Sequence, residues 1–187
     1  MMSLSAHKMG GPQGVGALIV RRRLRPFLKP LMFGGGQEGG LRPGTVPVHL
    51  AAGFGLAAEL AVTESAAWNE AAARYQRRIL DGLRPVGPVV NGDLDRLSPY
   101  ILNVSFPGLD NQQVTEAWST LAAVSNGSAC TSQQVHCSHV LHAMGFNDER
   151  AYSAVRLSWN QQTELPDLAA MVKALQRLPR EAHGGVS

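Results

Sequence analysis

A lysine and a histidine stand side by side near the start of the sequence, directly before a glycine-rich stretch. The segment is Ser5-Ala6-His7-Lys8, and glycines follow at positions 10, 11, 14 and 16. A lysine in a partly desolvated pocket has a lowered pKa and can form a Schiff base with an aldehyde. The alternative is an ordinary solvated lysine, which is the commoner case in proteins.

The first of the two cysteines lies in a run of small polar residues. Cys130 is preceded by Ser125-Asn126-Gly127-Ser128-Ala129 and followed by Thr131-Ser132. Glycine and small side chains keep such a loop mobile, so a thiolate there could travel between two sites. A free cysteine more often packs as a small buried hydrophobe, but so polar a loop disfavours burial. The second cysteine, Cys137, permits one disulfide, although nothing else indicates a secreted scaffold.

An arginine interrupts a mainly apolar run that is typical of a strand. Arg156 lies within Ser153-Ala154-Val155-Arg156-Leu157-Ser158. An arginine in that setting needs a fixed anion, and a planar carboxylate matches its two-pronged guanidinium. The pattern therefore indicates either a carboxylate-binding site or a structural ion pair.

A histidine and cysteine cluster superficially resembles a metal site. Its members are His136, Cys137, His139 and His142. Zinc sites usually combine two separated ligand pairs, whereas this cluster is compressed into one short segment with no carboxylate before Asp148. We therefore expect no metal site here.

Length and charge limit the classes of protein that remain. The 187 residues suffice for one domain or slightly more, and 44% hydrophobic residues are enough for a core, so a globular protein is expected. The first 50 residues carry seven cations against Glu38 alone, including the run Arg21-Arg22-Arg23-Leu24-Arg25. That run lacks the surroundings of a nucleic-acid module and indicates a solvated, partner-facing or phosphate-adjacent strand end. Without a signal segment or a run of ~20 apolar residues, the protein is expected to be cytoplasmic and not in a membrane.

The hydrophobic pattern predicts strands alternating with helices, and hence an α/β fold. Helices are expected at 48–60, 66–83, 115–121, 139–144 and 167–178. Strands are expected at 17–20, 89–90, 101–106, 121–124 and 153–158. The glycine-rich segment 34–45 is expected to be an irregular loop.

Taken in order, these segments resemble the cysteine desulfurases of the NifS/IscS type, which are class V aminotransferase-like, fold-type I pyridoxal-phosphate enzymes. The residues from Ser5 to Leu18 resemble the cofactor-lysine loop of that family, with Gln13 where lysine is common. The further matching segments are Gly34 to Thr45, Asn91-Gly92, Leu102 to Phe106, Ser128 to Ser132, and Val155 to Ser158.

The resemblance implies only the C-terminal half of such an enzyme. Residues 1–65 would form the end of the large cofactor-binding domain, with the lysine loop and the phosphate-side loop. Residues 66–187 would form the small C-terminal α/β domain that carries the cysteine loop. The family residues that grip the phosphate and face the pyridine ring from the first half of the fold have no counterpart in the sequence.

The resemblance also implies a role for each site residue. Lys8 would bind pyridoxal phosphate covalently and act as the proton-transfer base, with Ser5 and His7 near the phosphate. Thr45 would reach the phosphate of the other subunit in a homodimer, and Arg156 would bind the carboxylate of the substrate, L-cysteine. Cys130 would take the sulfur as a persulfide, release L-alanine and pass the sulfur to an acceptor protein.

Two other interpretations stay open at this point. The chain could be a catalytically incomplete desulfurase remnant or a dimerising partner of a complete enzyme. It could also be another class V enzyme, such as an aminotransferase or a selenocysteine lyase, in which Cys130 would matter less than Lys8 and Arg156. For a desulfurase, the acceptor could serve Fe-S cluster assembly, tRNA thiolation or DNA phosphorothioation, so that nucleic acid is at most an indirect partner.

Overall fold

The computed structural model describes residues 1–125 and 138–180. The chain divides into two compact units, Met1–Ala66 and Ala67–Ser187. We call them unit 1 and unit 2. Their assignment to a large and a small domain stays a prediction.

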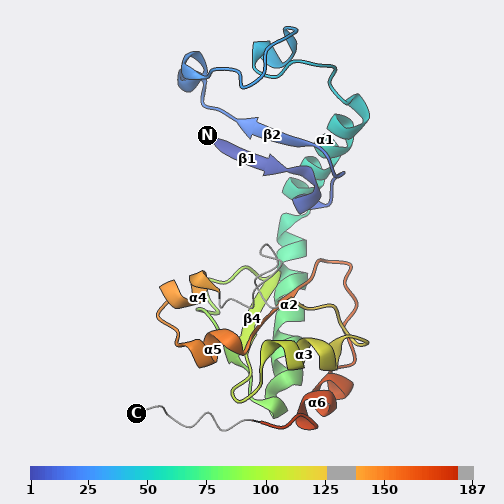
Figure 1. The fold of residues 1–187 in the computed structure, drawn as a ribbon. Coiled ribbons are helices and arrows are strands. Elements are labelled where there is room, and N and C mark those ends of the chain that lie inside the picture. The colour runs from blue at the N-terminus through green and yellow to red at the C-terminus, as the bar shows by residue number, and fades with distance from the viewer. Residues whose placement is uncertain (126–137, 181–187) are drawn as a thin grey trace. The chain divides into compact units, whose positions relative to one another are not determined.

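Unit 1 opens with a two-stranded antiparallel ribbon. Strand β1 (Met2–Ser5) pairs with β2 (Gly16–Ile19), and the 3-10 helix η1 (Ala6–Met9) lies between them in the chain (Figure 1). The strand expected at 17–20 is confirmed as β2. Its partner β1 was not predicted, because four residues beside a glycine-rich loop carry too little pattern to be recognised alone.

The middle of unit 1 is irregular. Two 3-10 helices, η2 (Arg22–Phe27) and η3 (Gln37–Gly40), are joined by extended and turn segments. The expectation that 34–45 is a loop needs one correction, since η3 lies inside it. That turn is not a regular helix, because Glu38 and Gly39 both have left-handed backbones, with φ of 52° and 64°.

Helix α1 (Val48–Thr63) completes unit 1 and extends three residues beyond the predicted helix. It approaches η1 closely where small residues meet. A Cβ placed on Gly11 would lie 3.1 Å from the Cβ atoms of both Ala57 and Ala6. Small side chains at this contact therefore permit the helix to pack on the turn that carries Lys8.

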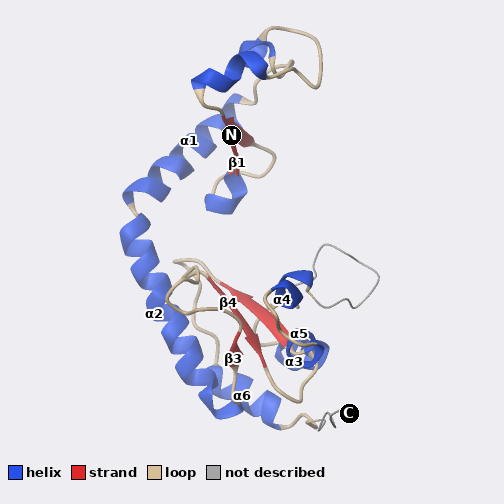
Figure 2. Ribbon diagram, turned by 90° about the vertical axis from the view of Figure 1, so that its left-hand side faces the viewer, coloured by secondary structure: helices blue, strands red, loops and turns tan. Residues whose placement is uncertain are grey.

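Unit 2 is built on a three-stranded antiparallel sheet in the order β3-β4-β5 (Figure 2). The strands are β3 (Val89–Val90), β4 (Ile101–Ser105) and β5 (Ala154–Ser158), all three expected from the sequence. The long helix α2 (Ser65–Leu83) precedes them and ends in the 3-10 turn η4 (Arg84–Val86).

Four shorter helices complete unit 2. They are α3 (Asn111–Trp118), α4 (His139–Ala143), α5 (Asp148–Tyr152) and α6 (Leu168–Gln176). Helix α3 starts at a capping box in which the side chain of Asp110 and that of Gln113 each accept a hydrogen bond from the other residue's backbone. The side chain of Asp167 likewise caps α6, at the start of the helix predicted at 167–178.

The core of unit 2 lies on one face of the sheet. Side chains alternate along a strand, so Leu102 and Val104 on β4 share a face with their β5 partners Leu157 and Val155. All four are buried in one cluster with side chains of α2, α3 and α6. At its centre Trp118 meets Phe106 edge to face, with ring centroids 5.5 Å apart, and donates its indole N–H to the carbonyl of Met171.

One predicted strand is wrong, and one helix was missed. Residues 121–124 form a turn and coil after α3, and only Ser125 makes an isolated bridge to the sheet. Their apolar side chains pack against the core without strand pairing, which explains the strand-like pattern. Helix α5 was not predicted, since five residues provide too short a window for helical periodicity.

Within the described ranges, no single helix is long and apolar enough to cross a membrane.

Candidate functional site

Lys8 lies on the short 3-10 turn that joins the two strands of the ribbon. Its turn is closed by two backbone hydrogen bonds, from the Ala6 N–H to the Val15 carbonyl and from the Gly11 N–H to the Ala6 carbonyl. The side chain of Ala6 is fully buried, whereas Lys8 and its neighbours Ser5 and His7 are exposed. The fold therefore fixes the backbone of this turn and leaves its reactive groups accessible.

Two glycines explain why this turn needs its unusual sequence. A Cβ at Gly16 would lie 2.6 Å from the carbonyl oxygen of Leu4 on the neighbouring strand, so a side chain there would push the ribbon apart. Gly10, which ends the turn, has a φ of 83°, in the left-handed region that other residues rarely adopt. The glycine pattern after Lys8 is thus a requirement of the ribbon itself.

Thr45 stands at the end of a loop that is held by its own side chains. The guanidinium of Arg42 donates to the carbonyl oxygens of Gly44 and Thr45, at 3.0 and 3.3 Å. The Gly44 N–H in turn donates to the side-chain oxygen of Gln37, at 3.2 Å. Thr45 is exposed, so its hydroxyl is accessible. This structural role of Gln37 and Arg42 was not predicted from the sequence.

Arg156 projects from the face of the sheet opposite the core. It alternates with the buried Val155 and Leu157, is itself exposed, and pairs across the sheet with Asn103. Within the described ranges, no ion pair joins its guanidinium to a carboxylate. The structural ion pair considered from the sequence has no carboxylate partner among these residues.

The backbone of Arg156 is tied to the residue from which the cysteine segment departs. The Ser125 N–H donates to the Arg156 carbonyl at 3.1 Å, and the Arg156 N–H donates to the Ser125 carbonyl at 2.6 Å. Two reciprocal hydrogen bonds fix the relative position of these two backbones. Cys130 itself lies outside the described residues, as do His136 and Cys137.

A polar network links α5, the helix that precedes β5, to β3 and β4. The Arg150 guanidinium donates to the side-chain oxygen of Asn91 at 2.7 Å and to the Val90 carbonyl at 2.8 Å, and it lies 3.9 Å over the ring of Phe146. The hydroxyl of Ser105 donates to the Arg150 carbonyl at 2.6 Å. This network joins β3, β4 and α5, and only Ser153 separates α5 from β5, the strand that carries Arg156. The roles of Arg150 and Ser105 were missed from the sequence.

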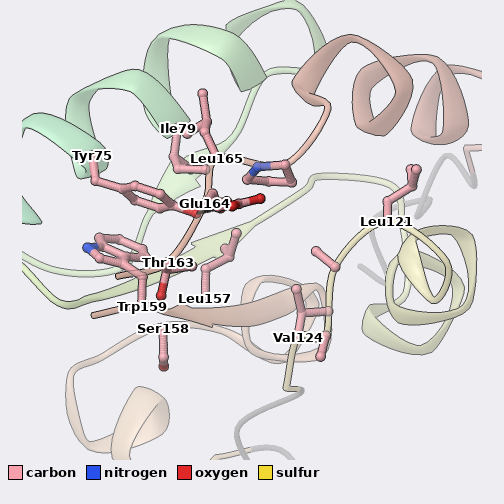
Figure 3. Close-up of a pocket in the computed structure, with 13 residues that line it drawn as sticks. Tyr75, Ile79, Leu121, Val124, Leu157, Ser158, Trp159, Thr163, Glu164 and Leu165 are labelled. Atoms are coloured by element: carbon pink, nitrogen blue, oxygen red, sulfur yellow. Dashed lines mark hydrogen bonds between the residues drawn. The ribbon is translucent and has the colours of Figure 1, made fainter. Parts of the chain in front are cut away.

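Unit 2 also contains a cavity of about 440 Å³, lined mainly by apolar side chains. Figure 3 shows Tyr75 and Trp159 on one side of it and Leu121 and Val124 on the other. The two aromatic rings lie 5.0 Å apart, and the Tyr75 hydroxyl donates to the carbonyl of Glu164. Burial raises the pKa of Tyr75 above its ordinary value, while the charge of Arg78 acts in the opposite direction. Arg156 does not line this cavity.

The histidines that suggested a metal site are only partly described. His142 lies 3.5 Å from the carboxylate of Asp148, so this pair links α4 to the start of α5. Among the residues with described positions, no group of three histidine, cysteine or acidic side chains is arranged to hold a metal ion.

Comparison with known proteins identifies the family. The model of the "Aminotransferase class-V" family matches residues 1–170. The chain belongs to this family. It is 45% identical over 164 residues to the cysteine desulfurase IscS of Vibrio cholerae serotype O1 strain O395, a match that covers 87% of this chain and 40% of that relative.

The chain also resembles solved protein structures. A NifS-like protein matches with a TM-score of 0.81 and 31% identity, covering 94% of this chain and 46% of that one. A structure described as SspA in complex with cysteine matches with a TM-score of 0.67 and 34% identity, covering 87% and 44%. The predicted α/β class and the resemblance to a fold-type I enzyme are thereby confirmed.

The chain spans 40% to 46% of the length of the relative and the two structures named above. Members of the family use pyridoxal phosphate, which carries an aldehyde and a phosphate. The exposed amine of Lys8 suits the aldehyde, and the hydroxyl of Ser5 and the imidazole of His7 on the same accessible turn suit the phosphate. The residues present therefore fit the attachment of this cofactor.

Proposed function

We propose that the chain supplies the lysine, the cysteine and the carboxylate-binding arginine of a pyridoxal-phosphate-dependent cysteine desulfurase. The observation that carries this proposal is the pair of hydrogen bonds between Arg156 and Ser125. It fixes the residue that would bind the substrate carboxylate to the residue from which the segment with Cys130 departs. A desulfurase needs this relation, because the bound substrate must come within reach of the sulfur-accepting thiolate.

Each residue has a distinct task in this reaction. Arg156 orients the substrate by its carboxylate, and Lys8 binds the cofactor aldehyde and then carries a proton. The cofactor, when bound, withdraws electrons from the substrate carbon skeleton. The Cys130 thiolate attacks the sulfur of L-cysteine, so an S–S bond forms while the substrate C–S bond breaks. The electron pair of the broken bond stays on carbon, which is protonated to give L-alanine, and Cys130 keeps the sulfur as a persulfide.

The partners follow from the same proposal. Ser5 and His7 would contact the cofactor phosphate, and Thr45 would contact that of the second subunit in a homodimer. The persulfide would pass to an acceptor protein, in the cytoplasm. Similarity to the IscS relative supports an acceptor in Fe-S cluster assembly, and tRNA thiolation and DNA phosphorothioation are alternative destinations of the sulfur.

A second candidate function is that of a catalytically incomplete partner. It is favoured by the share of the relatives that the chain covers, 40% for the Vibrio cholerae desulfurase. Catalysis depends on charges and dipoles around the whole site, so a chain that supplies only part of them should bind cofactor weakly and react slowly. For the 187 residues alone we therefore expect little activity.

One set of measurements tests both candidates. The purified chain is incubated with pyridoxal phosphate, alone and after coexpression with the part of the Vibrio cholerae desulfurase that it does not match. Visible absorbance is recorded before and after borohydride reduction, and alanine formation from L-cysteine is followed. We expect a reducible absorbance band that Lys8→Ala removes, weak for the chain alone and strong for the complex.

The variant Cys130→Ser separates binding from sulfur transfer. It should keep the absorbance band and lose alanine formation. Undiminished alanine formation by Cys130→Ser would instead indicate another class V reaction. An active chain without any coexpressed polypeptide would exclude the incomplete-partner function.

A further inference from the structure

Asn103 lies directly opposite Arg156 in the sheet of unit 2. The Asn103 carbonyl accepts a hydrogen bond from the Asn91 N–H on the β3 side, and the Arg156 backbone exchanges two with Ser125 on its outer side. Asn103 and Arg156 therefore form a pair without hydrogen bonds to each other. In such pairs of antiparallel strands the Cα atoms are about 4.5 Å apart and the side chains are close. Both side chains lie on the face of the sheet opposite the core.

A chain of hydrogen bonds determines the orientation of the Asn103 amide. A guanidinium can only donate, so the Asn91 side-chain atom 2.7 Å from Arg150 must be the oxygen. The NH2 group at the other end of the Asn91 amide donates to the Ser105 hydroxyl at 2.8 Å and to the Asn103 side chain at 2.7 Å. The Asn103 atom that meets Asn91 must therefore accept a hydrogen bond, and it is the side-chain oxygen.

The NH2 group of Asn103 is left to donate elsewhere. No side-chain hydrogen bond among the described residues uses this group as a donor. Asn91 and Ser105 are at most 4% exposed, whereas Asn103 is half-buried and Arg156 is exposed. The buried residues thus hold the amide by its oxygen and leave two N–H donors on the same accessible face as the guanidinium.

We propose that Asn103 is a second carboxylate-binding residue beside Arg156, and that Asn91 is the positioning residue that orients it. The ligand is the α-carboxylate of an amino acid. That this amino acid is L-cysteine rests on the proposed function. The Asn103 amide donates to one carboxylate oxygen and the Arg156 guanidinium to the other. Two donors on neighbouring strands favour a planar carboxylate over a single-atom anion such as chloride.

The first test measures carboxylate binding to the chain itself, without cofactor or turnover. The chain is labelled with 15N-arginine, the Nε–H resonance of Arg156 is assigned with Arg156→Lys, and L-alanine is titrated. We expect a saturable shift with L-alanine and none with L-alaninamide, which lacks the carboxylate. Asn103→Ala should weaken L-alanine binding at least about tenfold, because it removes a hydrogen bond to a charged group. Ile101→Ala, a truncation on the same face of β4, should weaken it less than about twofold.

Asn91→Asp tests the orientation of the amide separately. The aspartate has the size of asparagine and can still accept from Arg150, but it cannot donate to Asn103. The Asn103 amide should then turn its NH2 group toward the new carboxylate, so that its oxygen repels the ligand. We expect Asn91→Asp to weaken L-alanine binding at least as much as Asn103→Ala, with an unchanged far-ultraviolet circular dichroism spectrum. Unchanged binding in Asn103→Ala, or no saturable shift in the parent chain, would overturn the inference.

Kinetics of the coexpressed complex distinguish this inference from the proposed function. Asn103→Ala should raise the KM for L-cysteine about tenfold and change kcat less than about twofold, because the carboxylate is bound equally before and during the reaction. An active complex whose KM is unchanged in Asn103→Ala would overturn the inference and leave the proposed function intact. A complex that forms no alanine, although the chain binds L-alanine through Asn103, would overturn the proposed function and leave the carboxylate site intact.

Discussion

The two units of this chain differ in how many of their apolar side chains are buried. Unit 2 buries a continuous cluster that joins three helices to one face of its sheet. In unit 1, Ala6 and Ala57 are the buried apolar residues among those described, while Phe27, Leu31 and Phe33 are at least 80% exposed. Burial of apolar surface is the main stabilising contribution to folding, so the core of unit 2 contributes far more to stability than the few buried side chains of unit 1.

Glycine content reinforces this contrast. Unit 1 contains 12 of the 20 glycines in 66 residues, and several serve the turns around Lys8 and Thr45. Glycine loses more conformational entropy on folding than any other residue. Unit 1 therefore has a greater entropic cost to offset and less buried surface with which to offset it. The same turns hold the residues that the proposed reaction needs, so in this unit the geometry of the site is obtained at the expense of stability.

The largest expected difference is in amide hydrogen exchange of the uncomplexed chain. Amides of β4 in unit 2 should exchange at least roughly a hundredfold more slowly than those of β2 in unit 1, because exchange follows the free energy of local opening. Mass spectrometry of peptides after timed exchange measures this directly. Equal protection in both strands would mean that unit 1 is stable without a partner, and the contrast drawn above would fail.

The next effect compares one substitution in both units. Phe106 is fully buried in unit 2, and Phe33 is 87% exposed in unit 1. Phe106→Ala should lower the free energy of unfolding by about 3–5 kcal/mol, since it removes a buried ring and leaves a cavity. Phe33→Ala should change it by less than about 0.5 kcal/mol. Urea unfolding followed by far-ultraviolet circular dichroism measures the free energy of unfolding of both variants. A large loss of stability in Phe33→Ala would reveal packing of Phe33 within unit 1 that its exposed fraction does not indicate.

The sequence predicted unit 2 better than unit 1, for physical reasons. Helix α2 and strand β4 show their periodicity over enough residues to be recognised, and Asp167 marks the start of α6 by its capping side chain. In unit 1, β1 is four residues long and its pairing depends on the register with β2. The segment 121–124 was mistaken for a strand, because apolar residues that cover a core through a turn have the composition of a strand.

In the candidate site too, residues in continuous sequence motifs were predicted, whereas contacts between residues far apart in the sequence were not. The types and spacing of Lys8 and Arg156 were visible in the sequence, because they lie in continuous motifs. The bond between Ser125 and Arg156 joins residues 31 positions apart, and Arg150 reaches Asn91 across 59 positions. Such contacts are produced by tertiary packing and leave no local signal. A sequence motif therefore predicts which side chains can react. The register of β5 determines on which face of the sheet Arg156 lies.

The smallest expected effect concerns Tyr75, beside the cavity of unit 2. Burial raises the pKa of its hydroxyl above the ordinary value of 10.0. As the pH rises past 10, the unfolded chain loses this proton while the folded chain retains it, so the free energy of unfolding falls until the raised pKa is passed. Tyr75→Phe removes this titration. It also removes the hydrogen bond to the carbonyl of Glu164, which should cost about 0.5–1.5 kcal/mol at neutral pH.

The two effects of Tyr75→Phe have opposite signs, and pH separates them. Below pH 10 the variant should be less stable than the parent chain, because only the lost hydrogen bond counts. Above pH 10 the gap should narrow, because the parent then loses stability that the variant keeps. Urea unfolding at a series of pH values on both sides of 10 measures the gap. A gap that stays constant would mean that Tyr75 titrates alike in the folded and unfolded chain, and that this wall of the cavity is as accessible to water as the surfaces of unit 1.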